Sequence, residues 1–371
     1  MAQTTLEQPH KTAETRLVTD QRWPKVGIRW GLLGLLLGIL AVIFLVSLAL
    51  GSVNIPLKEI IHVLLGGEAS RESWTNIVLK FRLPKALTAS LAGASLAVGG
   101  LMMQTLFRNP LADPFVLGIS SGASLGAALV VLTAGTVGGT LLAGLGFFGD
   151  FSLAAAASIG AGLVMMLVLI AARRVQSSVT LLILGLMFGY MTSAFVSLLL
   201  YFNLPERVQA YINWTFGSFG GVTWGQMQIL APVVITGLGL SIGLTKSLNA
   251  LLLGESYARS MGLNVRRTRL VIVVTTALLA GAVTAFCGPI GFLGLAVPHL
   301  ARGLFGTSDH RVLMPGTILM GAIVALIAAL IAELPGSRLI LPLNAVTALL
   351  GAPVVIYVIL RHNGQKLTFM R

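Results

Sequence analysis

The chain has 371 residues, of which 56% are hydrophobic and only 10% are charged, and its mean hydropathy is +0.92. So small a share of charged side chains cannot cover the surface of a water-soluble fold, which excludes that class and indicates a polytopic membrane protein. The single cysteine, Cys287, excludes a disulfide framework and a Cys-rich metal site.

Uncharged apolar runs recur along the chain in lengths that match a membrane crossing. A transmembrane helix needs about 20 apolar residues to cross a bilayer. The run 114–149 predicts a crossing plus a loop, and 270–301 is divided by Gly288-Pro-Ile-Gly291 into a full span and a shorter one. The runs that each predict one crossing are 32–50, 86–107, 151–172, 179–202, 226–245, 312–332 and 345–360. We therefore expect an all-α, polytopic membrane protein of about ten transmembrane helices.

These runs divide the chain into one large domain and two tails. Residues 1–27 are polar and predict a disordered cytoplasmic tail. Residues 28–362 predict a single transmembrane domain, in which a polar segment at 248–268 stands out, and residues 363–371 predict a cytoplasmic C-terminal tail. A cleaved signal peptide is disfavoured because the first apolar run, of about 20 residues, is longer than the usual signal core.

The distribution of Lys and Arg predicts the orientation of the chain. If the N-terminus is inside and about ten helices follow, most of the 25 Lys and Arg residues fall on the inside, as the positive-inside rule requires. Both termini are therefore expected in the cytoplasm. The same pattern explains the net charge of +13, so nucleic-acid binding is not needed as an explanation.

The predicted outer loop at residues 52–85 departs from this rule. Its basic residues are Lys58, Arg71, Lys80, Arg82 and Lys85. One interpretation is that a long loop is partly exempt from the rule. The other is a basic patch that docks an acidic partner outside the membrane. The residues alone leave both interpretations open.

A polar segment between two predicted spans is the most informative part of the chain. Residues 255–267 read Glu-Ser-Tyr-Ala-Arg-Ser-Met-Gly-Leu-Asn-Val-Arg-Arg and must lie at the membrane face. Residues 250–261 predict a short helix, which Gly262 can end, and Asn264 can cap the next helix. So much local structure favours a docking surface for a soluble partner. A basic loop that only enforces the topology is the alternative.

Small residues recur at the spacing of close helix packing. Gly118, Gly122 and Gly126 lie four residues apart, and Gly93 pairs with Ala97 in the same way. Close approach through small residues supplies packing energy between helices in lipid. We therefore expect a tightly packed bundle and assign these glycines to architecture rather than to substrate binding.

Ionisable side chains are nearly absent from the predicted spans. Ion-coupled transporters place such side chains inside the membrane. Here His299 lies near the inner end of its span, where capping or packing is favoured over a proton relay. Secondary transport is therefore disfavoured. The sequence also lacks a Walker-type nucleotide loop and paired intramembrane carboxylates, which disfavours an intramembrane enzyme, so energy for transport must come from a partner.

Several segments together resemble the permease subunits of the bacterial ABC importers for iron chelates, haem and cobalamin. The resemblance runs from about residue 30 to residue 361, with its motifs in the family's order. Those of the first half are Arg82-Leu-Pro-Lys85, Gly93-Ala-Ser-Leu-Ala-Val-Gly99, Gln104-Thr-Leu-Phe-Arg-Asn-Pro-Leu-Ala-Asp-Pro114 and Leu117-Gly-Ile-Ser-Ser-Gly-Ala123. Those of the second half are Leu253-Gly-Glu-Ser-Tyr-Ala-Arg-Ser-Met-Gly262, Gly288-Pro-Ile-Gly-Phe-Leu-Gly-Leu-Ala-Val-Pro-His-Leu-Ala-Arg302, Asp309-His-Arg311 and Asn344-Ala-Val-Thr-Ala-Leu-Leu-Gly-Ala-Pro353.

The resemblance implies a ten-helix permease of the bacterial inner membrane that pairs with a second copy, or a homologue, around a central pathway. Two ATPase subunits, which bind ATP and Mg²⁺, would dock inside, and a substrate-binding protein would deliver the cargo outside. The chain itself would perform no covalent chemistry and hold no cofactor or metal. The implied cargo is a metal chelate, foremost a ferric siderophore, with haem or cobalamin as alternatives. Rivals from other classes are an ion-coupled secondary transporter and a membrane scaffold that recruits a partner other than an ATPase.

The resemblance also implies roles for particular residues. Those implied to couple to the ATPase, between the sixth and seventh helices, are Gly254, Glu255, Ala258, Arg259 and Gly262. Those implied to form the cytoplasmic gate are Asn109, Pro110, Leu111, Ser177 and Ser178. Those implied to dock the binding protein are Arg82, Lys85 and Arg338. Those implied to line the pathway, with packing against neighbouring helices as an equal alternative, are Met187, Tyr190 and Met191.

Two departures from the family pattern concern the outer docking residues. The family often has Asp and Arg near the end of the ninth helix, where this chain has Ala329 and Glu333. Glu333 is expected to weaken the outer basic patch, and Arg338 is placed to compensate. Lys85 replaces the more common Arg, which keeps the charge but loses the planar fork that binds a carboxylate through two hydrogen bonds.

Overall fold

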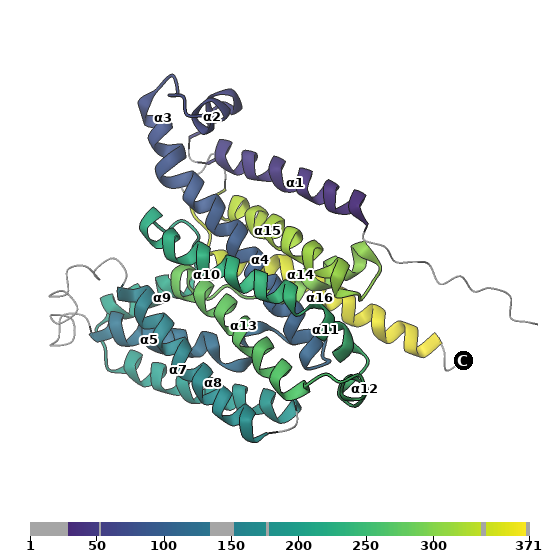
Figure 1. The fold of residues 1–371 in the computed structure, drawn as a ribbon. Coiled ribbons are helices and arrows are strands. Elements are labelled where there is room, and N and C mark those ends of the chain that lie inside the picture. The colour runs from purple at the N-terminus through teal and green to yellow at the C-terminus, as the bar shows by residue number, and fades with distance from the viewer. Residues whose placement is uncertain (1–28, 52, 134–151, 176–177, 335–338, 369–371) are drawn as a thin grey trace, which may run out of the picture.

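The fold is entirely helical in the ranges that the computed structural model describes, which are residues 29–51, 53–133, 152–175, 178–334 and 339–368 (Figure 1). This confirms the predicted all-α class. In chain order the elements are α1 (Trp30–Ala49), α2 (Leu57–Leu64), α3 (Glu72–Asn76), η1 (Ile77–Arg82), α4 (Leu83–Leu106), η2 (Pro114–Leu117), α5 (Ile119–Thr133), α7 (Ser152–Arg174), α8 (Ser178–Tyr201), α9 (Pro205–Thr215), α10 (Trp224–Gly243), α11 (Thr245–Leu252), α12 (Glu255–Ser260), α13 (Val265–Cys287), α14 (Leu293–Phe305), α15 (His310–Glu333) and α16 (Leu343–Thr368).

The spans agree with the predicted number of about ten. Among the described residues, seven helices are long and apolar enough to cross a membrane: α1, the continuous α3–η1–α4 rod, α7, α8, α10, α13 and α15. Three shorter apolar helices lie in α5, α14 and α16. The polar segment forms α11 and α12 between α10 and α13, which are the sixth and seventh of these spans in chain order.

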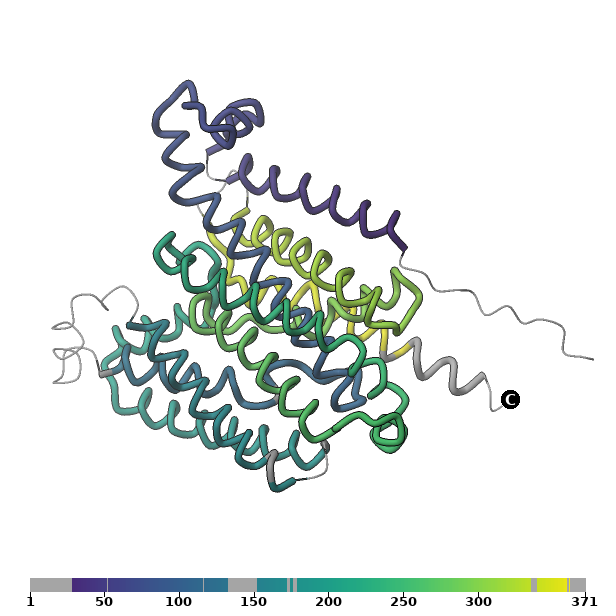
Figure 2. Tube along the Cα trace, in the orientation of Figure 1, coloured from purple at the N-terminus to yellow at the C-terminus, as the bar shows by residue number. Residues whose placement is uncertain are grey.

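Helix α4 is the centre of the bundle. In the apolar part of its span 83% of the residues are buried, against 17% for α1 and 22% for α8. It packs against α13, α14 and α15, whereas α5, α7 and α8 form a neighbouring group (Figures 1 and 2). Its outer half contributes to one buried apolar cluster and its inner half to a second. α4 therefore contributes to both buried clusters of the bundle.

Close approach of the helices depends on the glycines that the sequence indicated. A Cβ atom at Gly93 would collide with the carbonyl group of Gly321, because α4 and α15 meet at their backbones there. A Cβ atom at Gly126 would collide with the carbonyl group of Ala156, where α5 meets α7. The prediction that these glycines serve close packing is confirmed.

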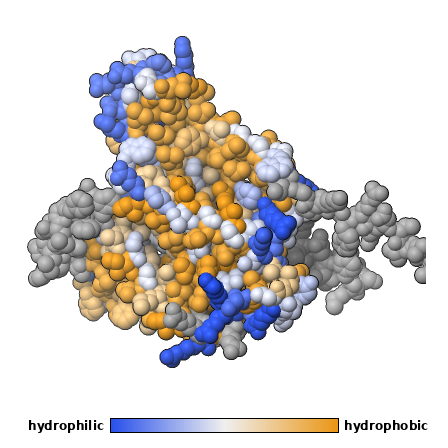
Figure 3. Space-filling model, in the orientation of Figure 1, coloured by the Kyte–Doolittle hydropathy of each residue, from blue (hydrophilic) through white to orange (hydrophobic). Residues whose placement is uncertain are grey.

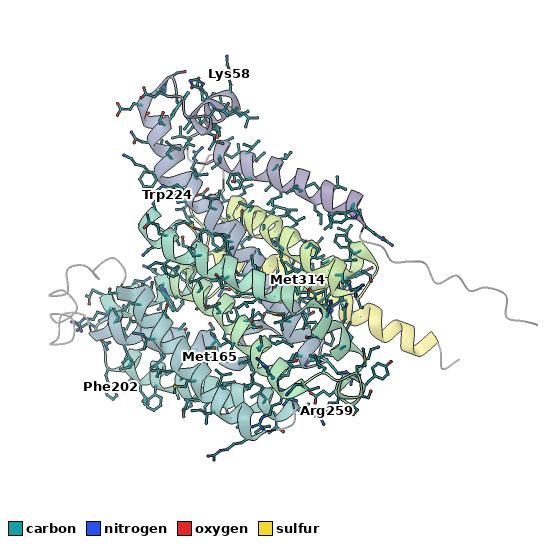
Figure 4. All side chains as sticks on the ribbon, in the orientation of Figure 1. Lys58, Met165, Phe202, Trp224, Arg259 and Met314 are labelled. Carbon is teal, nitrogen blue, oxygen red and sulfur yellow. The ribbon has the colours of Figure 1, made fainter. Side chains whose placement is uncertain are left out.

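Polar side chains gather at two opposite ends of the molecule. Helices α2 and α3 project past the end of α1 at one end, and α11 and α12 lie at the other (Figure 1). The space-filling view shows hydrophilic residues over these two ends and a mainly hydrophobic surface between them (Figure 3). Lys58 and Arg259 mark the two ends in Figure 4. This arrangement is that of a membrane protein with two polar faces.

The domain boundaries are only partly covered. The predicted N-terminal tail, residues 1–27, lies outside the described residues. Helix α16 continues to Thr368 and therefore runs past residue 362, where the sequence predicts the start of the C-terminal tail.

Candidate functional site

The polar segment between α10 and α13 folds into two short helices that are joined at a glycine. α11 ends at Leu252 and α12 begins at Glu255, so the single helix predicted over 250–261 is interrupted. The interruption lies at Gly254, whose φ of +106° and ψ of 153° are accessible essentially only to glycine. The prediction of one continuous helix here was wrong, because composition does not reveal a backbone reversal at a single residue.

The end of α12 follows the predicted pattern. Gly262 has a φ of +84°, and its amide donates to the carbonyl of Arg259 at 2.9 Å, while the Leu263 amide donates to the carbonyl of Ala258 at 3.0 Å. These bonds are those of a glycine-terminated helix. The Asn264 side chain then caps α13 by accepting a hydrogen bond from the backbone amide of residue 267 at 3.0 Å. The predicted glycine stop and asparagine cap are confirmed.

An apolar surface around α12 was missed from the sequence. Leu253, Tyr257 and Met261 are 62%, 54% and 60% exposed at a polar end of the molecule. They lie four residues apart, whereas Ala258 points inward and is fully buried. They could have been predicted from the recurrence of a large apolar residue at every fourth position in an otherwise polar segment. Exposed apolar residues grouped beside charged ones are typical of a protein docking surface.

The carboxylate of Glu255 is bound by two arginine side chains, one in α12 and one in α13. Its Oε1 accepts a hydrogen bond from Nη2 of Arg269 in α13 at 2.8 Å, and its Oε2 lies 3.4 Å from Nη2 of Arg259. The Glu255 side chain is 30% exposed and that of Arg269 only 5%. Arg269 also donates through Nη1 to the carbonyl of Val175, at the end of α7, over 3.4 Å. Glu255 therefore anchors α12 to the bundle, while Arg259 remains on the outer side.

The loop between α4 and η2 contains three predicted gate residues in a compact turn. The Oδ1 of Asn109 accepts from the backbone amide of Leu111 at 2.9 Å, which forms an Asx turn. The side chain of Asp113 then caps η2 by accepting from the amide of Phe115 at 2.9 Å. Burial raises the pKa of Asp113 to about 6. Leu111 is 43% exposed, so the turn presents an apolar side chain at its tip.

His299 holds this turn from the side of α14. Its Nε2 lies 2.8 Å from the carbonyl oxygen of Pro110, and because a carbonyl only accepts, Nε2 carries the proton and donates. The position of His299 therefore agrees with the structural role favoured from the sequence. Sequence reasoning did not find the partner, because 189 residues separate the two.

Polar side chains join the inner end of α4 to α14 and α15, and through α15 to α11. The Gln104 side chain accepts from Arg302 of α14 at 2.6 Å and donates to the carbonyl of Leu295 at 3.2 Å. The Thr105 hydroxyl lies 2.9 Å from Nε2 of the buried His310 in α15. The Asn249 side chain of α11 accepts from Nδ1 of His310 at 2.8 Å. The segment that carries α12 is therefore connected to the helix that leads into the gate loop.

The second predicted gate segment is only partly described. Ser177 lies outside the described residues, and Ser178 is the first residue of α8. Val175, which precedes the segment, follows the end of α7, and its amide donates to the carbonyl of Ala171 at 3.0 Å. Ser178 therefore begins the fifth span rather than preceding it, and the gate role of the segment stays a prediction.

Arg82, a predicted docking residue, has its guanidinium bound within its own chain. Nη1 donates to the carbonyl oxygens of Leu48 and Ala49 at 2.7 and 3.0 Å, and Nη2 donates to the carbonyl of Val53. These carbonyls belong to the C-terminal end of α1 and the turn that follows it. A guanidinium has five donors in a fixed fork, which suits several carbonyls at a helix end. Arg82 is therefore a capping residue, and it is only half-exposed.

Lys85, the second predicted docking residue, is neutralised by the residue predicted to oppose it. Its ammonium group forms an ion pair with Glu333 at the end of α15, with the two side chains 20% and 32% exposed. Arg338, predicted to compensate, lies outside the described residues. Within residues 53–85 the exposed basic residues are Lys58, Arg71 and Lys80. The Arg71 guanidinium lies 5.0 Å from the ring centroid of Trp74.

The three predicted pathway residues share one exposed face of α8. Met187, Tyr190 and Met191 are 50%, 68% and 47% exposed, and their spacing of three and four places them together on the helix. All three side chains are also partly covered by neighbouring residues, so pathway lining and helix packing both remain predictions for this face. Among the described residues, no group of three or more His, Cys, Asp and Glu side chains is arranged to hold a metal ion, and Cys287 is buried.

Comparisons with known proteins assign this geometry to one family. A model of the FecCD transport family matches residues 39–361. The vitamin B12 import system permease protein BtuC of Klebsiella pneumoniae subsp. pneumoniae is 38% identical over 337 residues, which are 91% of this chain and 95% of that protein. BtuC of Salmonella paratyphi A is 40% identical over 287 residues, 76% of this chain and 83% of that protein. A solved chain described as a metal-chelate type ABC transporter in an inward-facing conformation has a TM-score of 0.76 and 27% identity, covering 88% of this chain and 99% of that one.

Proposed function

Since the chain belongs to the FecCD transport family and is the multi-pass membrane permease of an ABC importer, we propose that it carries cobalamin into the cell. The observation that carries this proposal is the agreement of the relatives' names: those at 38–40% identity over most of the chain are vitamin B12 permeases. The ferric siderophore expected from the sequence is not confirmed. It remains the competing cargo because both are metal chelates, the class named for the related solved chain.

An importer of this kind works with ATPase partners and a substrate-binding protein. We propose that two ATPase subunits dock on α12 from the cytoplasm and bind the ATP and Mg²⁺, with this chain holding no cofactor. The exposed Leu253, Tyr257 and Met261 supply an apolar contact, and Arg259 supplies charge at its edge. Gly254 and Gly262 bound the docking helix with turns that fix its direction. Glu255 ties it to α13 instead of contacting the partner.

Opening and closing are proposed to occur at the two gate segments. The Asn109–Leu111 turn is held by His299 from α14, and the α7–α8 connection is approached by Arg269 from α13. The turn and the end of α7 are therefore each contacted by a side chain from another helix. Movement of α12 on ATP binding changes these contacts, and the cargo passes between the gates. The chain itself performs no covalent chemistry in this scheme.

The outer face and the second copy complete the proposed importer. The binding protein is proposed to approach the end that carries α2 and α3, with its acidic groups meeting Lys85 and the exposed Lys58. A second copy, or a homologue, is proposed to face the exposed side of α8, so that Met187, Tyr190 and Met191 line a pathway between the copies. Both termini are proposed to lie in the cytoplasm of a bacterial cell, with the chain in its inner membrane.

The cargo is tested by uptake into proteoliposomes that contain this permease with its ATPase and binding protein. Radiolabelled cyanocobalamin, a ferric hydroxamate siderophore and haem are offered separately, with ATP or a non-hydrolysable analogue inside. We expect ATP-dependent uptake of cyanocobalamin alone. Uptake of the siderophore alone would replace the cargo but keep the importer, whereas uptake driven by an ion gradient without ATP would overturn both.

The docking surface is tested in the same preparation. Leu253→Ala and Tyr257→Ala remove exposed apolar contacts at α12, and Leu65→Ala removes one of 82% exposure at the opposite end. We expect the first two variants to lose co-purifying ATPase and Leu65→Ala to retain it. Equal retention in all three would place the ATPase contact elsewhere.

A further inference from the structure

One buried cation at the cytoplasmic end of α13 differs from its neighbours. Arg266, Arg267 and Arg269 lie within the first turns of the helix. Arg266 and Arg267 are exposed, as expected of cations that orient a span, whereas the side chain of Arg269 is only 5% exposed. Removing a guanidinium from water is costly unless hydrogen bonds compensate it. Topology alone would be served by a third exposed cation, so the burial of Arg269 calls for another explanation.

The contacts of Arg269 connect two segments that are far apart in the chain. Nη2 donates to Oε1 of Glu255, the first residue of α12, at 2.8 Å. Nη1 of the same guanidinium approaches the carbonyl oxygen of Val175, which follows α7, at 3.4 Å. Val175 lies immediately before the proposed second gate segment and α8. One rigid, planar group therefore contacts both the proposed docking helix and the residue that follows α7.

The ion pair between Glu255 and Arg269 matters for the orientation of α12 because the helix is short and lies between two glycines. The helix has six residues, with Gly254 at φ +106° before it and Gly262 at φ +84° after it. A helix so short is held by its tertiary contacts rather than by its own hydrogen bonds. The ion pair with Arg269 is therefore a main determinant of the angle at which α12 leaves the bundle.

We propose that Arg269 is a positioning residue that makes α12 and the C-terminal end of α7 move as one unit, so that a displacement imposed on the docking helix also displaces the end of α7. The inference rests on the proposed role of α12 as the docking helix. A lysine at this position could reach either Glu255 or the Val175 carbonyl, but its single point of charge lacks the fork that serves both. The guanidinium shape, and not only its charge, is the functional property.

The test compares Arg269→Lys with the matched variant Arg267→Lys, an exposed arginine of the same helix. Both are assembled with the ATPase and the binding protein, and transport per ATP hydrolysed is measured. We expect Arg269→Lys to hydrolyse ATP but to transport about tenfold less cargo per ATP. Arg267→Lys should match the parent. Equal transport per ATP in Arg269→Lys and the parent would overturn the inference while leaving the importer intact.

A second measurement reports the linkage without any cargo. Spin labels are placed at Arg174→Cys, at the exposed end of α7, and at Ser256→Cys, exposed on α12, because Cys287 is buried and does not label. In the assembled complex the parent should give one narrow distance distribution with and without ATP. Arg269→Lys should give a broad distribution that changes with ATP. A distribution as narrow as that of the parent would count against the linkage.

Two further outcomes are distinguishable. If Arg269→Lys does not accumulate in the membrane, Glu255→Gln is measured instead, since it keeps the shape of the side chain and weakens the same pair. The same broadening is expected, and its absence would contradict the inference. A parent chain that binds no ATPase would overturn the proposed function and this inference with it, whereas a parent that carries another chelate would leave the inference standing.

Discussion

Nε2 of His299 in α14 donates a hydrogen bond of 2.8 Å to the carbonyl oxygen of Pro110, in the turn that follows α4. The contact fixes the tip of the proposed cytoplasmic gate to a neighbouring helix. It also gives the histidine a role that requires neither a proton gradient nor a change of charge.

The first prediction concerns this bond. His299→Ala removes the donor to the carbonyl oxygen of the exposed Pro110 and should weaken the closed turn by about 1 kcal/mol, which raises the leak of cargo without ATP several-fold. His299→Gln, which keeps an N–H donor, should retain ATP-driven uptake. The measurement is efflux from preloaded proteoliposomes, with Leu304→Ala, an exposed residue of the same helix, as the control. Loss of uptake in His299→Gln would favour a proton relay instead.

The second prediction concerns the ion pair between Lys85 and Glu333. If Lys85 meets an acidic group of the binding protein, Glu333 competes for it. Glu333→Gln should therefore tighten binding of that protein, by up to about fivefold because such partly exposed pairs are worth at most about 1 kcal/mol. Lys85→Met should weaken it. Binding to the permease in nanodiscs at low and high salt measures both effects. Weaker binding in Glu333→Gln would exclude Lys85 as the docking group.

The third prediction concerns the turn before α12. Gly254 adopts φ +106° and ψ 153°, where an L-residue is strained, so Gly254→Ala should cost about 1–3 kcal/mol locally. The proposed result is loss of bound ATPase, measured by co-purification, because α12 is misdirected. Gly303→Ala is the matched control, since Gly303 is helical and a Cβ there meets open space. A Gly254→Ala variant that binds ATPase as the parent does would show that the turn is not needed for docking.

The fourth prediction concerns pH and Asp113, which lies outside the membrane-spanning helices. Burial raises its pKa to about 6, above about 4 in an unfolded chain. The folded protein therefore holds this proton more tightly, and the resulting stability, present below about pH 4, is lost as the pH rises through about 6. Asp113→Asn keeps the carbonyl that caps η2. It should be more stable than the parent at pH 7.5, by at most about 3 kcal/mol, and equal to it at low pH.

The measurement for Asp113 is thermal unfolding in detergent across this pH range. Glu59→Gln provides a control of opposite sign, because hydrogen bonds from the Ser70 side chain and backbone lower the pKa of Glu59. The stability from Glu59 is present above its unfolded pKa and is lost on acidification, so Glu59→Gln should lose stability at neutral pH. A parent whose stability rises steadily from pH 4 to pH 7.5, with no difference in Asp113→Asn, would contradict the buried-acid assignment.

Several local features were predictable because their causes are local. Gly262 ends α12 and Asn264 caps α13, since a positive φ favours glycine and an Asn side chain reaches an amide three residues on. The apolar runs gave the spans because a bilayer sets one minimum length for all of them. The Gly93 and Gly126 contacts followed from spacing alone, although the facing helices were not identified.

What the amino-acid sequence by itself determined is therefore the class of the protein, its approximate number of spans, the position of the polar segment between the sixth and seventh spans, and its family. Only the tertiary structure decided which charges are available. In the folded chain Glu255 forms an ion pair with Arg269, and Lys85 forms one with Glu333. The Arg82 guanidinium donates hydrogen bonds to carbonyl groups at the end of α1. Each of these contacts joins residues that are distant in the chain, and a buried charge takes whichever partner the packed helices bring within reach. No local pattern carries that information, because the choice is made by the geometry of the assembled bundle.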